Sequence, residues 1–215
     1  YSTPYDAKLD PDAFFTFGEY WNLAEWGLPA EVVEPVGFKY ILDRRARFPG
    51  GAARRGSKVM LVSQPHISRA LGAVFGTVVK HRPDVQFILK LHPQDVDRWW
   101  ERYPCGREMN VQVPVEPSSD LYALFAECRC VIGYDSTVLF EASFFGLAVG
   151  ILNLDGRNRC SALEFDGRYN FHEIRDPGQI DDLLGAEQSS CEYDANPFFA
   201  AFDKARFQRL MGIVA

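Results

Sequence analysis

The sequence predicts a doubly wound, mostly parallel α/β sheet of the Rossmann-like kind, with additional segments before and after it. Short apolar runs alternate with segments of helical period from residue 57 onward, which is typical of βα units. Several of these runs are apolar at successive positions, as expected for strands that helices cover on both faces. The chain of 215 residues is long enough for one complete domain with extra pieces.

Five strands are expected in this region, and four helices connect them. The strands span residues 58–63, 85–91, 110–115, 130–133 and 148–154. The first helix lies within 66–83, where Ile67, Leu71, Val74 and Val78 share one face and Pro83 ends the periodicity. The other helices lie within 94–104, 117–128 and 136–146.

Capping residues mark two of these helices. Ser118 or Ser119 is the expected N-cap of the helix within 117–128, because a hydroxyl there accepts from a free backbone N–H group. Gly146 is expected to end the helix that begins near Ser136.

The flanking segments follow a different pattern. A strand is expected within 12–18, a helix within 19–27 that Gly27 ends, and a strand within 31–37. We therefore assign residues 1–56 to the end of an N-terminal domain and an interdomain connection, 57–192 to the Rossmann-like domain, and 193–215 to a C-terminal helix from about residue 197 to 211. The chain lacks an initiator Met, so we expect a piece of a longer protein, although a processed terminus would look the same.

Composition narrows the class of protein. Hydrophobic residues make up 47% and charged residues 24%, and no apolar run reaches the roughly 20 residues of a membrane span. A net charge of −6 with scattered Lys and Arg argues against nucleic acid as a partner. The segment 43–58 holds five Arg and one Lys, and we interpret it as a solvated loop, with an anionic membrane or acceptor contact as the alternative.

The cysteines and histidines do not form metal-binding patterns. The five cysteines include no CxxC pair, and buried free thiols in a reducing cytoplasm explain them best. The four histidines are far apart and form neither an HxxxH nor an HExxH motif. We therefore expect no metal site, and the N-terminus shows no cleavable secretory signal.

Three polar clusters follow predicted strands: "SQPH" at 63–66, "LHP" at 91–93 and "YDST" at 134–137. Ligands of open parallel sheets bind at the carboxyl ends of the strands, where loops and helix N-termini direct N–H groups outward. The clusters therefore locate the expected binding site. The first of them lacks a GxGxxG motif, so an NAD site is not expected.

The turn at residues 133–137 is suited to an anion. It frees the first N–H groups of a helix and adds the hydroxyls of Ser136 and Thr137, so it can hold a phosphate without a Walker lysine. The alternative is that Asp135 or Ser136 only caps the helix.

His92 and Glu141 are the other candidate functional residues. Pro93 pre-sets the backbone after the strand, so the His92 imidazole is presented at the sheet edge, where it can donate to a phosphate or act as an acid. A solvent-facing loop histidine is the alternative. Glu141 lies one helical turn after Thr137, and its carboxylate suits ribose hydroxyls, although the helix dipole alone also favours a glutamate there.

The order of these motifs resembles a known family. "KLHP", followed some forty residues later by "GYDSTVLFEASFFG", resembles the nucleotide-binding C-terminal domain of bacterial GT-B glycosyltransferases that build capsular and surface polysaccharides. It is most similar to the sialyltransferase and polysialyltransferase types, with their His-Pro and Ser/Thr motifs, and to the related CDP-glycerol transferases. The similarity covers roughly residues 35–185, and "FTFGEYW" to "PVGFKYI" looks like the passage from their N-terminal domain.

The resemblance implies a role for each motif residue. His92 and Pro93 would contact the nucleotide phosphate, with His92 as a leaving-group acid. Ser136 and Thr137 would hold the same phosphate, Glu141 the ribose and Glu116 the base. Ser63, Gln64 and Tyr134, from the strand-end clusters, complete the predicted nucleotide-binding set.

The implied enzyme is a metal-independent GT-B glycosyltransferase without a cofactor, and residues 57–192 would be its nucleotide-sugar-binding domain. It would move a sugar, from a CMP-sugar by preference, to a surface polysaccharide or glycolipid acceptor, and this chain would be the donor-binding part. The missing N-terminal domain would supply the general base, so the fragment would be inactive alone. We expect a cytoplasmic, bacterial location, with contact at the cytoplasmic face of the inner membrane left open.

Three alternatives stay open. A CDP-glycerol glycerophosphotransferase would use the same half-domain. A UDP-sugar 2-epimerase-like enzyme has a similar fold, but its additional acidic catalytic set is not seen in this chain. A non-catalytic interaction domain would bind no nucleotide and would use an exposed aromatic face, such as Trp99 and Trp100.

Overall fold

The computed structural model describes residues 12–21, 29–47, 56–115, 120–154, 169–186 and 197–212. The chain divides into two compact units, one of residues 1–47 with 191–215 and one of residues 48–190. The first unit therefore combines an N-terminal and a C-terminal segment that the sequence analysis assigned separately. The division at residues 56 and 192 stays a prediction.

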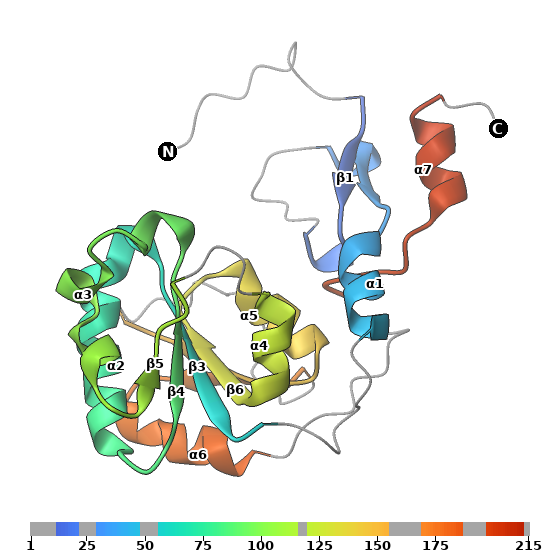
Figure 1. Ribbon diagram of the computed structural model, residues 1–215. Helices are drawn as coiled ribbons and strands as arrows, with labels where there is room; N and C mark the ends of the chain where they lie inside the picture. The colour runs from blue at the N-terminus through green and yellow to red at the C-terminus, as the bar shows by residue number, and fades with distance from the viewer. Residues whose placement is uncertain are drawn as a thin grey trace. The chain divides into compact units, whose positions relative to one another are not determined.

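The larger unit contains a six-stranded sheet (Figure 1). All neighbouring strands are parallel. Their spatial order is β5 (Val111–Gln112), β4 (Phe87–Lys90), β3 (Lys58–Val62), β6 (Cys128–Gly133), β7 (Ala148–Leu152) and β8 (Phe171–Ile174). The order of strands along the chain reverses between β3 and β6, which is the switch point of a doubly wound fold. The predicted fold class is confirmed.

Helices cover both faces of this sheet. Figure 1 shows α2 (Ser68–His81) and α3 (Trp99–Arg102) on one side, and α4 (Leu121–Glu127) and α5 (Thr137–Phe144) on the other. Another helix, α6 (Ile180–Gly185), contributes Ile180 and Leu183 to the same buried cluster as Leu71 and Phe75 of α2. Burial of these apolar side chains is the main stabilising contribution to the unit.

The sequence located most of these elements, with two errors. Strand β8 was missed because no element was predicted at residues 171–174, where His172 and Glu173 are only half-buried. The N-cap of α4 was placed at Ser118 or Ser119, which lie outside the described residues. The cap is Asp120, whose Oδ1 accepts from the Tyr122 backbone N at 3.0 Å. Gly146 follows α5 with a φ of 78°, as predicted.

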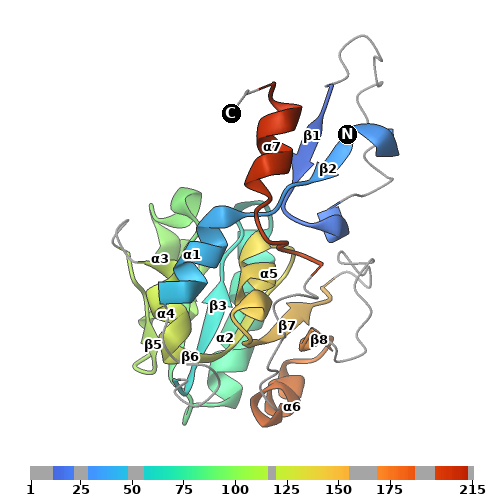
Figure 2. The same cartoon turned by 90° about the vertical axis from the view of Figure 1, so that its right-hand side faces the viewer.

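The smaller unit contains a parallel pair, β1 (Phe14–Thr16) and β2 (Val33–Pro35), with α1 (Lys39–Arg47) and α7 (Lys204–Leu210) (Figure 2). Backbone hydrogen bonds join its two segments: Ala200 N donates to Phe17 O at 2.8 Å and Asp203 N to Val36 O at 3.0 Å. The Trp21 indole N–H donates to Phe198 O at 2.7 Å. These contacts explain why the two ends of the chain form one unit.

Three sequence predictions in the smaller unit need correction. The basic loop assigned to 43–58 begins within α1, where Arg44, Arg45 and Arg47 occupy the last turn. Basic side chains there interact favourably with the negative end of the helix dipole. The C-terminal helix covers only Lys204–Leu210, less than the predicted 197–211. Of the predicted helix at 19–27, the described part, Glu19–Trp21, is a 3₁₀ turn, and residues 22–27 lie outside the described residues.

Three cysteines of the larger unit are free and buried: Cys105, Cys128 and Cys130. Burial raises the pKa of the Cys105 thiol to about 11 and that of each of the other two to about 12. These thiols are therefore protonated near neutral pH and behave as small apolar core groups. Cys160 and Cys191 lie outside the described residues.

Two glycines of α2 predict opposite effects of the same substitution. An added Cβ at Gly72 would lie 1.9 Å from the carbonyl oxygen of Arg102, whereas a Cβ at Gly76 meets no atom within 4 Å. Gly72→Ala should therefore lower the free energy of unfolding by about 1–3 kcal/mol, because backbone must shift. Gly76→Ala should raise it by up to about 1 kcal/mol through helix propensity. Urea denaturation measures both, and equal stability of the two variants would contradict the close packing of α2.

Candidate functional site

The ends of β3, β4 and β6 lie at one level of the sheet. Leu61 of β3 pairs with Leu89 of β4 on one side and with Ile132 of β6 on the other. The loops that follow these strands therefore start at the same edge. Since β3 lies between its neighbours, the ends of β4 and β6 are two strand spacings apart, about 10 Å. A ligand above the end of β3 would be flanked by both loops.

Hydrogen bonds connect the three loops. The backbone N of His92 donates to Ser63 Oγ at 2.6 Å, which ties the loop after β4 to the loop after β3. The backbone N of Asp135 donates to Gln64 Oε1 at 3.2 Å, which ties the loop after β6 to the same place. The structure thus brings together the three polar clusters, with Ser63 and Gln64 in the centre. The Gln64 side chain thus crosses the switch point and accepts the hydrogen bond of the Asp135 backbone N–H group, which is therefore not free to bind a ligand.

His92 has a defined ring orientation. Its side chain is exposed, and Nδ1 accepts from the Gln94 backbone N at 3.2 Å. His92 thereby caps the 3₁₀ turn Pro93–Asp95, in which Pro93 occupies the first position. Because Nδ1 is an acceptor, the neutral ring carries its hydrogen on Nε2, which becomes the outward donor. This is the donor that a phosphate oxygen requires.

The N-terminus of α5 has two roles. Ser136 is its N-cap, and Oγ accepts from the Val138 backbone N at 3.3 Å, so the capping role considered for Ser136 is realised. Thr137 is exposed at the first helical position. Within the described part of the chain, no protein acceptor receives the backbone N–H groups of Ser136 and Thr137. Together with the Thr137 hydroxyl, they form a donor set at the positive end of the helix dipole.

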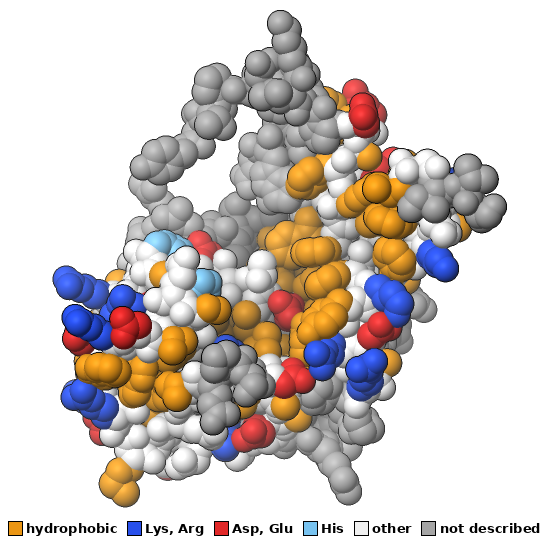
Figure 3. Space-filling model, turned by 45° about the horizontal axis from the view of Figure 1, so that its top comes forward, with side chains coloured by type: hydrophobic (Ala, Val, Ile, Leu, Met, Phe, Trp, Pro, Cys, Tyr) orange, Lys and Arg blue, Asp and Glu red, His pale blue; other side chains and the backbone are white. Residues whose placement is uncertain are grey.

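Tyr134 and His66 lie between the first and third loops. Tyr134 is buried, and its ring centroid is 6.5 Å from that of the exposed His66. Tyr134 was predicted to contact the nucleotide, but its side chain is buried and packs beneath the loops of the candidate site. His66 belongs to the "SQPH" cluster but not to the predicted nucleotide-binding set, although its side chain is exposed. Histidine side chains (pale blue) reach the surface in Figure 3, which brings the top of Figure 1 forward.

Glu141 lies one turn further along α5 and is bonded to a neighbouring helix. Its Oε2 accepts from the Tyr122 hydroxyl of α4 at 2.8 Å. Burial raises the pKa of the Glu141 carboxyl, and the hydrogen bond from Tyr122 opposes this only in part. The carboxyl thus links α5 to the start of α4, which follows the predicted base-binding residue Glu116. Glu116 itself lies outside the described residues, and ribose binding by Glu141 stays a prediction.

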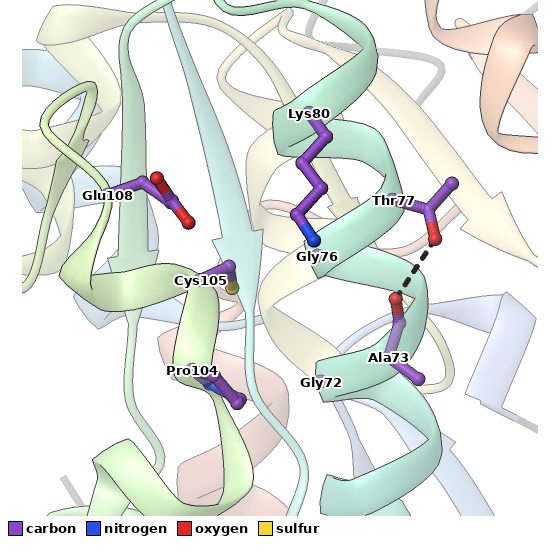
Figure 4. A pocket seen from close by; sticks show the side chains of 8 residues that line it. All are labelled: Gly72, Ala73, Gly76, Thr77, Lys80, Pro104, Cys105 and Glu108. Atoms are coloured by element: carbon purple, nitrogen blue, oxygen red, sulfur yellow. Dashed lines mark hydrogen bonds between the residues drawn. The ribbon is translucent and has the colours of Figure 1, made fainter.

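A cavity of about 260 Å³ lies elsewhere in the larger unit, between α2 and the 3₁₀ turn Pro104–Arg107 (Figure 4). Its lining comprises Gly72, Ala73, Gly76, Thr77, Lys80, Pro104, Cys105 and Glu108. None of the predicted site residues lines it. The cavity is on the flank of the sheet and is separate from the strand-end site.

Two further findings for the described residues concern metal clusters and membrane-spanning helices. Across these ranges, no group of three or more His, Cys, Asp or Glu side chains is arranged to hold a metal ion. Among the helices that the structure describes, none is both long and apolar enough to cross a bilayer.

Known structures share this fold. UDP-GlcNAc 2-epimerase of Methanocaldococcus jannaschii, in complex with UDP-GlcNAc and UDP, superposes with a TM-score of 0.64 at 15% sequence identity, over 94% of this chain and 61% of the epimerase chain. S. aureus MnaA, in a co-structure with UDP, gives a TM-score of 0.62 at 12% identity, over 94% of this chain and 60% of its own. The fold is of the GT-B type.

A transferase gives a similar result. A variant of the wall teichoic acid polymerase TagF has a TM-score of 0.52 at 13% identity, over 94% of this chain and 56% of TagF. The chain thus spans about 60% of the length of these structures. No protein-family model matches the chain, and no curated protein matches it in sequence.

Glu141 predicts a pH-dependent stability. Its pKa is higher in the folded chain than in the unfolded chain, so its contribution is fully present below about pH 4.3, the ordinary glutamate pKa, and is lost as pH rises through the folded-state pKa. Glu141→Gln removes this loss. The free energy of unfolding of the variant minus that of wild type should therefore increase from pH 4.5 to pH 7.5.

Urea denaturation at the two pH values measures the effect. Tyr122→Phe is the matched variant, because it removes the hydrogen bond that partly lowers the Glu141 pKa, and it should lose more stability than wild type over the same interval. A Glu141→Gln variant whose stability relative to wild type is independent of pH would refute the burial of this carboxyl.

Proposed function

We propose that the chain is the donor-binding part of a GT-B glycosyltransferase, which transfers a sugar from a nucleotide-activated donor to a surface glycan. One observation carries the proposal: the donors of His92, Ser136 and Thr137 lie on either side of the end of β3, at the switch point of the sheet. This is where open α/β sheets bind their ligands.

The residues have complementary roles toward a nucleotide phosphate. The N–H groups of Ser136 and Thr137 and the Thr137 hydroxyl hold phosphate oxygens at the α5 N-terminus. His92 Nε2–H donates a hydrogen bond to the leaving phosphate oxygen from the opposite side, with Pro93 fixing the loop. Charge that develops on the leaving group is stabilised by these fixed dipoles, so neither a metal ion nor a cofactor is required.

The remaining contacts extend from this phosphate. Glu141 would bind the ribose hydroxyls and Glu116 the base, and Gln64 would exchange its bond with Asp135 N for one with the ligand. The favoured donor is a CMP-sugar. The acceptor is a surface polysaccharide or glycolipid, and the general base comes from an N-terminal domain of the same protein. The proposed location is cytoplasmic and bacterial, with peripheral membrane contact and no nucleic acid partner.

Likeness to TagF, a wall teichoic acid polymerase, favours a transferase, and the second candidate is therefore a CDP-glycerol type glycerophosphotransferase. Likeness to the UDP-GlcNAc 2-epimerase and to UDP-bound MnaA supports a UDP-sugar enzyme. These candidates use the same phosphate site and differ in the base and in the number of phosphates. A non-catalytic interaction domain would bind none of the three nucleotides.

Calorimetric titration of CMP, CDP and UDP tests the proposal. Tightest binding of CMP is expected for a CMP-sugar transferase, of CDP for a CDP-glycerol enzyme and of UDP for a UDP-sugar enzyme. His92→Ala and Thr137→Val should each weaken the preferred nucleotide by about 1–3 kcal/mol, because each removes a donor to a charged phosphate. Thr137→Val retains the Ser136 cap of α5.

His81→Ala is the control, since His81 is also exposed but lies at the end of α2 and pairs with Asp181. Its nucleotide affinity should equal that of wild type. Absence of binding to all three nucleotides, or unchanged affinity of both His92→Ala and Thr137→Val, would overturn the proposed site.

A further inference from the structure

We propose that Asp95 is the positioning residue of the nucleotide site, a buried carboxylate that holds the loops after β3 and β4 in one arrangement and thereby orients His92. The inference rests on the proposed function and adds a residue to it. Asp95 is not among the residues that would touch the nucleotide. It acts through Ser63, Tyr103 and its own backbone.

Asp95 is fully buried, and both oxygens of its carboxylate accept hydrogen bonds. Its side chain has 0% exposure. Oδ2 accepts from Ser63 Oγ at 2.9 Å and from the Tyr103 hydroxyl at 3.2 Å, and Oδ1 accepts from Arg102 Nη1 at 2.8 Å. A buried carboxylate is costly unless it is paired and hydrogen-bonded, so these three contacts fix its position. The Tyr103 hydroxyl is also buried, and burial together with the Asp95 charge raises its pKa.

The carboxylate sets the direction of two hydroxyl groups. Because a carboxylate only accepts, both Ser63 and Tyr103 direct their hydrogens toward Asp95 and present lone pairs on the other side. Ser63 Oγ then accepts from the His92 backbone N at 2.6 Å. The Tyr103 oxygen accepts from the Gln64 backbone N at 3.3 Å. One buried charge therefore positions a residue of each loop.

The arrangement holds His92 at three points. Its backbone N is bonded to Ser63, its carbonyl oxygen accepts from Asp95 N at 2.8 Å, and its ring Nδ1 accepts from Gln94 N at 3.2 Å. The backbone N of Gln64 is bonded to the Tyr103 hydroxyl, and the Gln64 side chain accepts from Asp135 N in the third loop. A change at Asp95 should thus alter the His92 ring, which a purely structural buried ion pair elsewhere would not do.

Asp95→Asn is the test variant, since it preserves shape but replaces an acceptor with an N–H donor and removes the charge opposite Arg102. Asp84→Asn is the matched control: Asp84 also pairs with an arginine, Arg82, at 2.7 Å, but it is exposed and has no contact with the site loops. Two readouts are compared, the ¹⁵N spectrum of the His92 imidazole, assigned by its loss in His92→Ala, and affinity for the tightest binder among CMP, CDP and UDP.

In wild type the His92 spectrum should show the Nε2–H tautomer. Asp95→Asn should shift it toward a mixture of tautomers and weaken the nucleotide about ten-fold, equivalent to the loss of a hydrogen bond to a charged group. Asp84→Asn should change neither readout. Ser63→Ala is the second variant if Asp95→Asn does not fold. It removes the link from Asp95 to His92 N and should shift the same His92 resonances.

The outcomes separate the two proposals. If wild type binds no nucleotide, the proposed function fails, while a His92 shift confined to Asp95→Asn and Ser63→Ala still supports the positioning role of Asp95. If wild type binds nucleotide but folded Asp95→Asn, or Ser63→Ala in its place, has wild-type His92 resonances and affinity, the positioning role is overturned and the nucleotide site stands.

Discussion

The parallel register of β3, β4 and β6 is the constraint on which the site depends. Leu61 pairs with both Leu89 and Ile132, so the three strands end together and their loops share one edge. The reversal of strand order at β3 and β6 then directs the following helices to opposite faces, and open α/β sheets bind their ligands at such a switch point. An imidazole and a helix N-terminus can meet one ligand there only because the backbone pairing places both at the same height.

Local hydrogen bonds convert this edge into a site with defined donors. His92 uses one ring nitrogen to cap its own turn, which leaves the other as an outward donor. Ser136 similarly uses its hydroxyl oxygen to cap α5 and retains its own hydrogen. A capping role and the proposed binding role are therefore compatible in the same residues. Ser136 can therefore cap α5 and still donate its hydroxyl hydrogen to a ligand.

The sequence predicted the sheet and the loops of the site better than the contacts that hold them. Strands such as β3 and β7 are nearly continuous apolar runs because helices cover both faces of the sheet, and the sequence predicted them. Strand β8 was not predicted, because the polar residues His172 and Glu173 interrupt its apolar pattern. Helix α1 was not predicted, because the arginines of its last turn are equally typical of a surface loop. The contacts of Asp95 and Tyr103 join residues 32 and 39 positions apart, a pairing that no local pattern encodes.

Mapping of backbone amide shifts on addition of CMP, CDP or UDP tests the central claim most directly. The account predicts that the amide resonances of Gln64, His92, Ser136 and Thr137 move together and saturate with one dissociation constant, because one phosphate contacts all three loops. Shifts centred on Gly76 and Glu108, which line the cavity beside α2, or shifts in only one of the three loops, would contradict it.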